Sequence, residues 1–413
     1  MVTVIIGAGA AGLAAAYAAS VRGESVLVLE KNEKAGKKIY ITGKGRCNVT
    51  NACDFDVFRK SIVNGEKFMM SSLRAFGPEE LMDFLEKNHC RVKVERGNRV
   101  FPVSDHASDV TKALLLALGN AGVRIHYHTE VTAIEKDAEG FAVTAVEGNR
   151  KIRQYADKVI VCTGGLSYPT TGSTGDGYRF AEKFGLSVRK PVPSLTELVT
   201  REDTSSLAGV SLINTGVTVR KVREDNAPGK EVLRDVGELL FTHKGLSGPL
   251  ILTASALITR ALSEGEKFEI SLDLKPGLSR EELDKRLLRD LEAAKNQDMG
   301  NALSRLLISG IRELVLGRAE IPSEKKAHDL RKEERERLLK TIKNLTFEVL
   351  RQGDFSGAVI TQGGVDLKEI NPKNMESKKV PGLFFAGEVL DVDAMTGGFN
   401  LQIAFSTGMA SGK

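Results

Sequence analysis

The sequence is poor in cysteine and has no long apolar run. Its 413 residues include four cysteines, none in a Cys-x-x-Cys pair or a His/Cys cluster. Neither a disulfide framework nor a metal site is therefore expected. No apolar run approaches the roughly 20 residues needed to cross a membrane. The first strand pattern starts almost at once and leaves no room for a signal peptide, so we expect a cytoplasmic protein without a membrane partner.

A strong charge of either sign is also missing. The formal net charge is +5 at pH 7, and the pI is near 8.8. Such a mildly basic chain permits an anionic partner such as RNA, although an ordinary solvated surface is the simpler explanation. No aromatic-rich RNA-binding motif accompanies the charge. The length exceeds one ordinary core, so two or three domains are expected.

The most informative segment is the N-terminal one. An apolar strand pattern at Val2–Ile6 leads into Gly7, Gly9 and Gly12, which form G-x-G-x-x-G, and an Ala-rich helix pattern follows. In a dinucleotide-binding fold the first glycine makes the tight turn, the second lets a pyrophosphate approach the backbone, and the third lets the helix pack on the strand. The N–H groups at the helix start then bind the phosphates.

A second strand pattern, Ser25–Leu29, ends in the acid Glu30. An acid at this place accepts hydrogen bonds from ribose hydroxyls. It also repels a 2′-phosphate, which disfavours NADP at this site and leaves FAD and NAD as candidates. The remaining alternative is a glycine-rich turn in another kind of α/β protein.

Changes of pattern divide the chain into five segments. Residues 1–190 form the first part of a nucleotide-binding domain, 191–275 are β-rich and typical of a small barrel or sandwich, and 276–343 are helical and densely charged. Residues 344–357 return through the β-rich insert, and 358–413 complete the first domain. Simple NAD dehydrogenases complete their N-terminal unit without such a return, so this organisation favours FAD. We predict the α/β class, with a Rossmann-like two-dinucleotide-binding flavoprotein fold, an inserted β-barrel domain and a small helical domain.

Local patterns also predict individual elements. One continuous helical stretch is expected near Phe55–Phe76, and a second at Pro78–Asn88. Within the insert, Glu231–Arg234 and Gly237–Phe241 are expected as separate short strands.

Two motifs near the C-terminus are typical of flavoproteins. The strand pattern Leu383–Ala386 ends in Gly387-Glu388, where an acid can bind the ribitol hydroxyls, the alternative being an ordinary strand-ending turn. Thr396–Leu401 opens the last helix with two glycines. Its N–H groups can face the pyrimidine end of a flavin, where negative charge develops on reduction, although it could be only a glycine-rich helix entry.

The loop Gly43–Asn48 allows three interpretations. Its cations and N–H groups could cradle the diphosphate of the cofactor, Cys47 could be a redox residue beside the flavin, or the loop could be structural. No second cysteine stands close enough for a Cys-x-x-Cys pair. We favour the cradle.

Three further segments carry candidates. Thr163–Gly165 follows an apolar strand and is predicted to lie against the cofactor. Asp176 is interpreted as a helix N-cap, with a role in the flavin site as an equal alternative. His243 and Lys244, in a glycine-rich loop, could face the substrate or the flavin, although lone histidines are more often structural.

Together these segments resemble the bacterial family described as BaiN-like or aminoacetone-oxidase-like NAD(P)/FAD-dependent oxidoreductases. The resemblance implies an FAD-binding domain that carries a barrel and a helical insert, bound FAD, and NAD(P)H as a transient reductant. Amine oxidation, steroid-ring reduction and reduction of a uracil in ribosomal RNA have been attached to its members. The matching stretches are Val4–Gly12, Gly36–Asn51, Ser167–Gly177, Phe241–Pro249, Gly363–Val365 and Pro381–Gly408.

The combined prediction is an FAD-dependent oxidoreductase that uses NAD(P)H to reduce a carbon–carbon double bond. Its substrate is a small molecule or an RNA, with a uridine of ribosomal RNA as one candidate. The alternatives are an O₂-using flavin oxidase of small amines such as aminoacetone, and a flavin-bearing binding protein without turnover.

The sequence does not single out a catalytic residue; the candidates are His243, Lys244 and Cys47. The predicted cofactor-binding residues are Gly7, Gly9, Ala10, Ala11, Gly12, Glu30, Lys31, Lys37, Lys38, Gly45, Arg46, Cys47, Asn48, Val131, Thr163, Gly164, Gly165, Gly387, Glu388, Gly398, Asn400 and Leu401.

Overall fold

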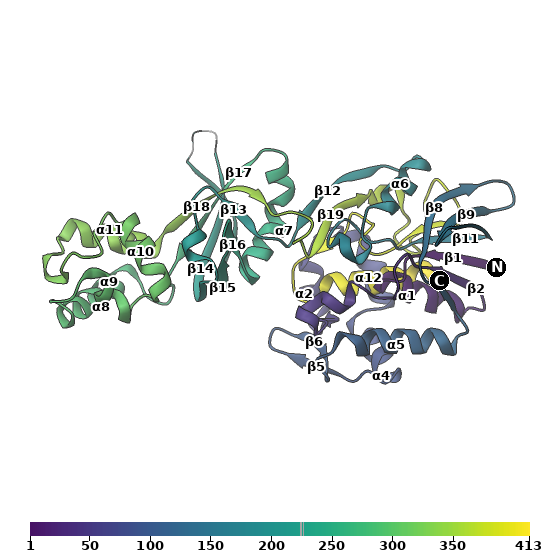
Figure 1. The fold of residues 1–413 in the computed structure, drawn as a ribbon, viewed down its shortest axis with the longest axis horizontal. Helices are drawn as coiled ribbons and strands as arrows, with labels where there is room; N and C mark the ends of the chain where they lie inside the picture. Colours follow the sequence, from purple (N-terminus) through teal and green to yellow (C-terminus); the bar gives the residue numbers. More distant parts are fainter. Residues whose placement is uncertain (224, 226) are drawn as a thin grey trace. The chain divides into compact units, whose positions relative to one another are not determined.

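The structure is a computed structural model that describes residues 1–223, 225 and 227–413. It divides into two compact units, one formed by residues 1–194 and 354–413 and the other by residues 195–353. Figure 1 shows the elements of each unit. The described part of the chain contains no helix that is long and apolar enough to span a bilayer.

The first unit is built on a five-stranded parallel sheet in the order β20-β11-β1-β2-β7. Both faces of its central strands are buried, so these strands are mainly apolar, with Thr3 and Lys158 as buried polar exceptions. Ile5 packs with the helices on one face, whereas Val4 and Ile6 pack in the core on the other. The strands are β1 (Val2–Ile6), β2 (Ser25–Leu29), β7 (Arg124–His126), β11 (Lys158–Val161) and β20 (Leu383–Phe385).

The helices of this unit include two with many small residues that pack closely. α1 (Ala10–Ser20) and α12 (Phe399–Gly412) touch where Gly408 meets Ala11, and a Cβ on Gly408 would lie 2.3 Å from the Ala11 carbonyl oxygen. This contact explains the Ala-rich sequence of α1, because larger side chains would separate the helices. The remaining helices are α2 (Phe55–Lys60), α3 (Glu66–Ala75), α4 (Pro78–Lys87), α5 (Ala107–Asn120) and α6 (Asp176–Lys183).

Smaller sheets complete the unit. The antiparallel sheet β10-β9-β8 packs in the core opposite α1, β3-β6-β5 is a second small sheet, and β12 pairs with β19 and β4 with β21. The strands are β3 (Thr50–Asn51), β4 (Ile62–Asn64), β5 (Val92–Glu95), β6 (Arg99–Pro102), β8 (Thr129–Lys136), β9 (Phe141–Glu147), β10 (Arg150–Ala156), β12 (Val188–Ser194), β19 (Ile360–Val365) and β21 (Asp393–Ala394).

The prediction of one helical stretch over Phe55–Phe76 is wrong. The strand β4 interrupts it, because Asn64 pairs with Asp393, a residue far along the chain. Gly65, with φ of 86°, then starts α3. A pairing of this kind has no local signal in the sequence.

The second unit is a closed six-stranded barrel in the order β13-β16-β15-β14-β17-β18. Residues 231–241, predicted as two strands, belong to one strand, and the chain between β16 and β17 forms a helix that the sequence analysis missed. The elements are β13 (Leu198–Thr200), β14 (Ser211–Val222), β15 (Pro228–Phe241), β16 (Gly245–Ser247), α7 (Pro249–Ser263), β17 (Lys267–Asp273) and β18 (Leu345–Gln352).

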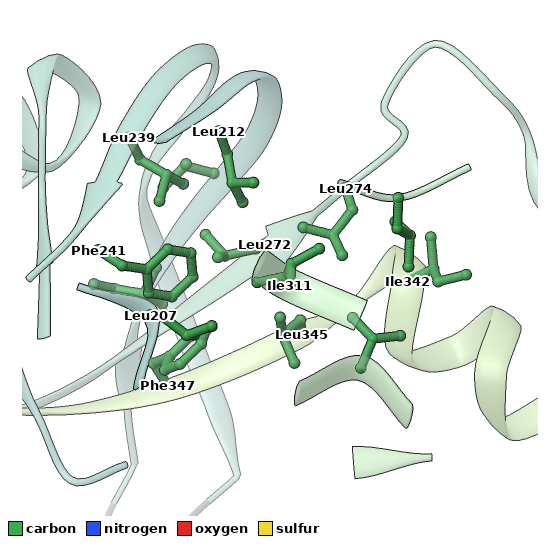
Figure 2. Packing of buried hydrophobic residues seen from close by; sticks show 14 of the residues in the cluster. Leu207, Leu212, Leu239, Phe241, Leu272, Leu274, Ile311, Ile342, Leu345 and Phe347 are labelled. Carbon is green, nitrogen blue, oxygen red and sulfur yellow. The ribbon is translucent and has the colours of Figure 1, made fainter. Parts of the chain in front are cut away.

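Four helices are inserted between β17 and β18, namely α8 (Arg280–Ala293), α9 (Met299–Ala302), α10 (Ser309–Arg318) and α11 (Lys332–Lys343). They share one hydrophobic core with the barrel. Figure 2 shows barrel residues such as Leu272 and Phe347 in the same cluster as Ile311 and Ile342 from the helices. The barrel and the helical segment are therefore one packed unit.

Candidate cofactor-binding site

The glycine-rich turn after β1 has one glycine that no protein contact requires. Gly7 has φ of 98°, and a Cβ there would lie 2.6 Å from the Cys162 carbonyl oxygen, so the protein itself requires a glycine. Gly12 is required as well, since its Cβ would collide with the Gly7 carbonyl at 1.8 Å. Gly9 is different, because its φ of −79° suits any residue and its Cβ would meet no described atom within 4 Å. This open space over the backbone is what the approach of a pyrophosphate needs.

The first turn of α1 is suited to bind an anion. It contains no acidic residue, and no side chain caps its free N–H groups. Ala10 and Ala11 begin the helix and are almost fully buried. The positive end of the helix dipole and these N–H groups therefore favour a phosphate beside Gly9.

Glu30 is buried at the end of β2, with 6% of its surface exposed. One carboxylate oxygen accepts a hydrogen bond from Ala8 N at 2.7 Å. The other accepts from the backbone and the side-chain amide of Asn32, at 2.8 and 2.7 Å. Glu30 thus shapes the glycine-rich turn, and each oxygen keeps acceptor capacity for a ribose hydroxyl.

The start of α12 offers a second set of free backbone donors. α12 begins after Gly398, has no acid in its first turn and no side-chain cap. It runs parallel to α1, because Gly408 and Gly412 lie against Ala11 and Ala15. Gly408 is the tenth residue of α12, and it lies beside Ala11, the second residue of α1. Along their common direction α12 therefore extends eight residues beyond the start of α1, which at 1.5 Å per residue offsets the two helix starts by about 12 Å.

Glu388 follows β20 and is held by donors from three separate segments. Its Oε1 accepts from Ser167 Oγ at 2.5 Å and from Thr361 N at 2.8 Å. Its Oε2 accepts from Lys38 Nζ at 2.7 Å. The preceding residue, Gly387, lies against Ala11 at the start of α1. The structure thus brings two predicted site residues, Lys38 and Glu388, together next to the glycine-rich turn.

Sequence reasoning missed Ser167 and Thr361. The Thr361 hydroxyl accepts hydrogen bonds from Leu166 N at 2.8 Å and from Ser167 N at 3.0 Å. It thereby fixes the turn that presents Ser167 to Glu388. Ser167 opens the matching stretch Ser167–Gly177, and Thr361 lies outside every matching stretch. The resemblance points to neither as a partner of Glu388, so the tertiary arrangement identifies that role.

The side chain of Arg46 anchors the loop Gly43–Asn48, the predicted cradle of the diphosphate. Arg46 forms ion pairs with Glu95 and Asp105, the latter at 2.6 Å, and its guanidinium lies 4.2 Å from the centre of the Phe101 ring. The charge of Arg46 is therefore engaged within the protein, and Gly45 beside it is exposed.

Cys47 is fully buried, and burial raises the pKa of its thiol to about 12. Thr42 opposes this shift through a hydrogen bond. The thiol is therefore protonated at neutral pH, which disfavours a nucleophilic or redox role.

Asn48 and Thr163 each keep a buried polar atom free. The Oδ1 of Asn48 and the Oγ1 of Thr163 have no hydrogen-bond partner among the described residues. Asn48 lies against the start of α12, since a Cβ on Gly398 would be 2.9 Å from that oxygen. Unsatisfied buried polar atoms are rare, and a cofactor in this site could supply their partners.

The predicted site lysines Lys31 and Lys37, after β2, are paired with acids. Lys31 donates to Asp176 at 2.8 Å, and Lys37 lies 3.1 Å from Glu33. The prediction that Asp176 caps α6 is wrong, because Gly175 occupies the N-cap and Asp176 is the first helical residue. Burial alone would raise the pKa of Asp176, but the hydrogen bond from Lys31 helps to hold it below its usual range.

The remaining predicted residues lie as follows. Gly164 and Gly165 continue the turn after β11, and a Cβ on Gly165 would be 3.1 Å from Glu388 Oε1. Asn400 uses its side-chain amide to bind Ala394, with bonds of 2.9 and 2.8 Å. Leu401 is half-buried in the first turn of α12, and Val131 is buried in β8.

His243 and Lys244 lie in the second unit, in the exposed turn between β15 and β16. Within residues 1–223, 225 and 227–413, no hydrogen bond or ion pair involves either side chain, and no group of three or more His, Cys, Asp or Glu could bind a metal. Their role stays a prediction.

Comparison with known proteins identifies the family. The family model described as "HI0933-like protein Rossmann domain" matches residues 1–413. The chain belongs to the HI0933-like flavoprotein family. It is an FAD-dependent oxidoreductase.

Members of this family and more distant structures resemble the whole chain. A "3-dehydro-bile acid delta(4,6)-reductase" of Clostridium scindens is 32% identical over 99% of this chain and 97% of its own length. A "Ribosomal RNA dihydrouridine synthase" of Escherichia coli is 31% identical over 98% of this chain and 96% of its own length. Among solved structures, a 3-ketosteroid delta1-dehydrogenase from Sterolibacterium denitrificans aligns with a TM-score of 0.51 over 99% of this chain and 98% of its own length. Its sequence identity is 14%, so it supports the fold alone.

The first unit fits FAD. The open backbone at Gly9 suits the diphosphate, and Glu30 suits the ribose. The ribitol chain of FAD separates its diphosphate from its ring, and two helix starts offset by about 12 Å along the helix direction suit the two ends of that chain. Asn48 supplies a free acceptor beside the second helix start.

Proposed function

We propose that this oxidoreductase reduces a carbon–carbon double bond that is conjugated to a carbonyl group. The proposal rests on one observation: the names of two relatives describe the same kind of reaction. A delta-reductase adds hydrogen across a ring double bond, and dihydrouridine is uridine with its ring double bond reduced. Both relatives match this chain over nearly its whole length.

The residues of the first unit bind and orient the cofactor in this proposal. The α1 N–H groups and Gly9 hold the diphosphate, Glu30 holds the ribose, and Glu388 holds the ribitol. The free N–H groups of α12 stabilise the negative charge that reduction places at the pyrimidine end. Bound FAD supplies hydride transfer, and we propose NAD(P)H as the source of that hydride.

For the substrate we propose a uridine of ribosomal RNA, on the basis of two relatives. The Escherichia coli and Haemophilus influenzae proteins with that name are each 31% identical to this chain. The net charge of +5 is compatible with a polyanion. A 3-oxo-4-ene steroid is the rival substrate, suggested by the bile-acid reductase.

The experiment is a parallel turnover assay with FAD-loaded protein. Consumption of NADH and of NADPH is followed with protein-free ribosomal RNA, with a 3-oxo-4-ene steroid and with aminoacetone, while hydrogen peroxide is measured. The expected result is NAD(P)H consumption coupled to the gain of two hydrogens by the RNA or the steroid, found by mass spectrometry. Peroxide release with aminoacetone alone, or no turnover with any of the three, would contradict the proposal.

The matched control is Gly9→Ala. The added methyl group would meet no atom of the described residues within 4 Å, so the fold should be kept while the diphosphate is excluded. Turnover that persists in this variant without bound FAD would show that the reaction does not use this site.

A further inference from the structure

The loop between Thr42 and Cys47 contains an unusual backbone run. Gly43 has φ and ψ of 57° and 32°, Lys44 follows with 57° and 42°, and Gly45 has φ of 86°. The left-handed region is disfavoured for residues with a Cβ, so a lysine between two left-handed glycines costs conformational free energy. Such outliers persist where the surroundings impose them, and they cluster at functional sites.

The protein holds this run in place from both sides. Cys47 N donates to the Thr42 carbonyl at 3.0 Å, and Arg46 N donates to the Gly43 carbonyl at 3.3 Å. The Arg46 side chain is bound to Glu95 and Asp105. The backbone of Lys44 is therefore fixed by its neighbours, while its side chain is exposed.

Lys44 differs from the other cations of this region. Four cations between residues 31 and 46 have carboxylate partners, and Lys34 lies 4.4 Å from the centre of the Tyr40 ring. Within the described chain, the exposed Lys44 side chain has no hydrogen bond, ion pair or ring contact. It is thus the one cation of the loop whose charge the protein does not use. The paired cations are Lys31, Lys37, Lys38 and Arg46.

The loop continues directly into the segment that packs on the start of α12. A Cβ on Gly398 would lie 2.3 Å from the Thr50 carbonyl oxygen, and Asn51 Nδ2 donates to the Gly397 carbonyl at 3.0 Å. Lys44 is four residues before Asn48, which also touches Gly398. The strained backbone of Lys44 is therefore held close along the chain to the proposed site of the flavin ring, and its ammonium has no partner among the described residues.

We propose that Lys44 is a catalytic residue whose ammonium donates a hydrogen bond to the substrate carbonyl oxygen. The inference rests on the proposed function. Hydride from the reduced cofactor adds to the carbon β to the carbonyl, and the π electrons of the double bond move onto the carbonyl oxygen as an enolate. The α carbon then takes a proton from water, which completes the addition of two hydrogens. Lys44 keeps its own proton and stabilises the oxygen while it is negative.

The first test needs no turnover. A phenolate presents an anionic oxygen on a flat ring and serves as a stable analogue of the enolate. Binding of 4-nitrophenolate to the FAD-loaded protein is measured by calorimetry for the wild type, Lys44→Met and Lys44→Arg. The expected result is a dissociation constant about tenfold or more higher in Lys44→Met and close to the wild-type value in Lys44→Arg.

The second test separates transition-state from ground-state effects. With the substrate that the wild type reduces, kcat should fall by roughly 10²-fold or more in Lys44→Met, with KM little changed. Lys44→Gly should show the same loss, and its midpoint of thermal unfolding should be no lower than that of the wild type, because glycine suits the left-handed backbone. Lys67→Met, which removes an exposed charge on α3, is the control and should match the wild type.

Four results would overturn the proposal. They are loss of FAD from Lys44→Met, unchanged phenolate binding, a raised KM with unchanged kcat, and an equal effect of Lys67→Met. If the wild type reduces no conjugated substrate but still binds phenolate through Lys44, the proposed function fails while the anion-binding role of Lys44 stands.

Discussion

The ammonium of Lys38 lies 2.7 Å from Oε2 of Glu388, although 350 positions separate the two residues in the chain. This ion pair joins the loop after β2 to the turn after β20. The turn in turn lies against Ala11 at the start of α1. The candidate cofactor site is therefore assembled from both ends of the first unit, and a chain that lacked the C-terminal return could not form it.

Gly9→Ala tests whether the glycine-rich turn serves a ligand. The backbone at Gly9 suits alanine, and the methyl group would enter open space, so the apo protein should unfold at the wild-type temperature or slightly above it. FAD affinity should fall at least about tenfold, because the methyl group occupies the place of the pyrophosphate. Fluorescence titration with FAD and thermal unfolding of the apo protein measure the two effects.

The control for this prediction is Gly7→Ala. Its Cβ would lie 2.6 Å from a backbone oxygen at a φ of 98°, so it should destabilise the protein itself. If Gly9→Ala lowers apo stability as much as Gly7→Ala does, the glycine at position 9 is structural.

Gly408→Val should separate α1 from α12. A Cβ at this position would lie 2.3 Å from the Ala11 carbonyl oxygen, and backbone cannot move aside as a flexible side chain can. We expect a loss of about 1–3 kcal/mol in the free energy of unfolding, together with weaker FAD retention, because both helix starts shift. Urea denaturation and the flavin content after gel filtration measure these effects.

Gly119→Ala is the matched control for the α1–α12 contact. Its Cβ would meet no atom of the residues that the structure describes within 4 Å, and alanine favours a helix, so α5 should gain up to about 1 kcal/mol. If the Gly408→Val variant is as stable as the wild type and keeps its full flavin content, the two helices need no close contact.

The parts of the fold that the sequence predicts are those with local signals. The turn from β1 into α1 depends on neighbouring glycines, and the acid at Glu30 follows a strand at a fixed spacing, so both are visible in the sequence. The break at β4, and the contacts of Glu388 with Ser167 and Lys38, depend on pairing across more than 200 residues. α7 was missed because its apolar residues follow a β-rich region and also fit a buried strand.

The pKa of Cys47 predicts both its reactivity and a pH dependence. Burial raises the pKa of this thiol from 9.0 to about 12, so the folded protein holds the proton more tightly than the unfolded chain does. Its contribution to stability should therefore be complete below about pH 9 and be lost as the pH rises towards 12. Urea unfolding between pH 8 and pH 11 should show a smaller alkaline loss in Cys47→Ser than in the wild type.

The same pKa makes the thiol inert at neutral pH. Alkylation of Cys47 by iodoacetamide, followed by peptide mass spectrometry, should be negligible unless the protein unfolds. Cys47→Ser should retain most of the turnover. A loss of several hundredfold with FAD still bound would make Cys47 catalytic.

The last prediction concerns His243 and Lys244. Both side chains are exposed and form no hydrogen bond or ion pair with the described residues, so replacing both by alanine should leave unfolding unchanged. The flavin spectrum and FAD content should also stay the same, because the cofactor motifs lie in the first unit. If either residue is an acid or base in the reaction, turnover should fall by roughly 10²–10⁴.

Since the backbone of the turn is fixed by hydrogen bonds such as Thr242 N to the Gly245 carbonyl at 2.9 Å, a loss of turnover cannot be ascribed to a rearranged loop. Loss of FAD would assign the turn to the cofactor site, and survival of both FAD and turnover would make it structural.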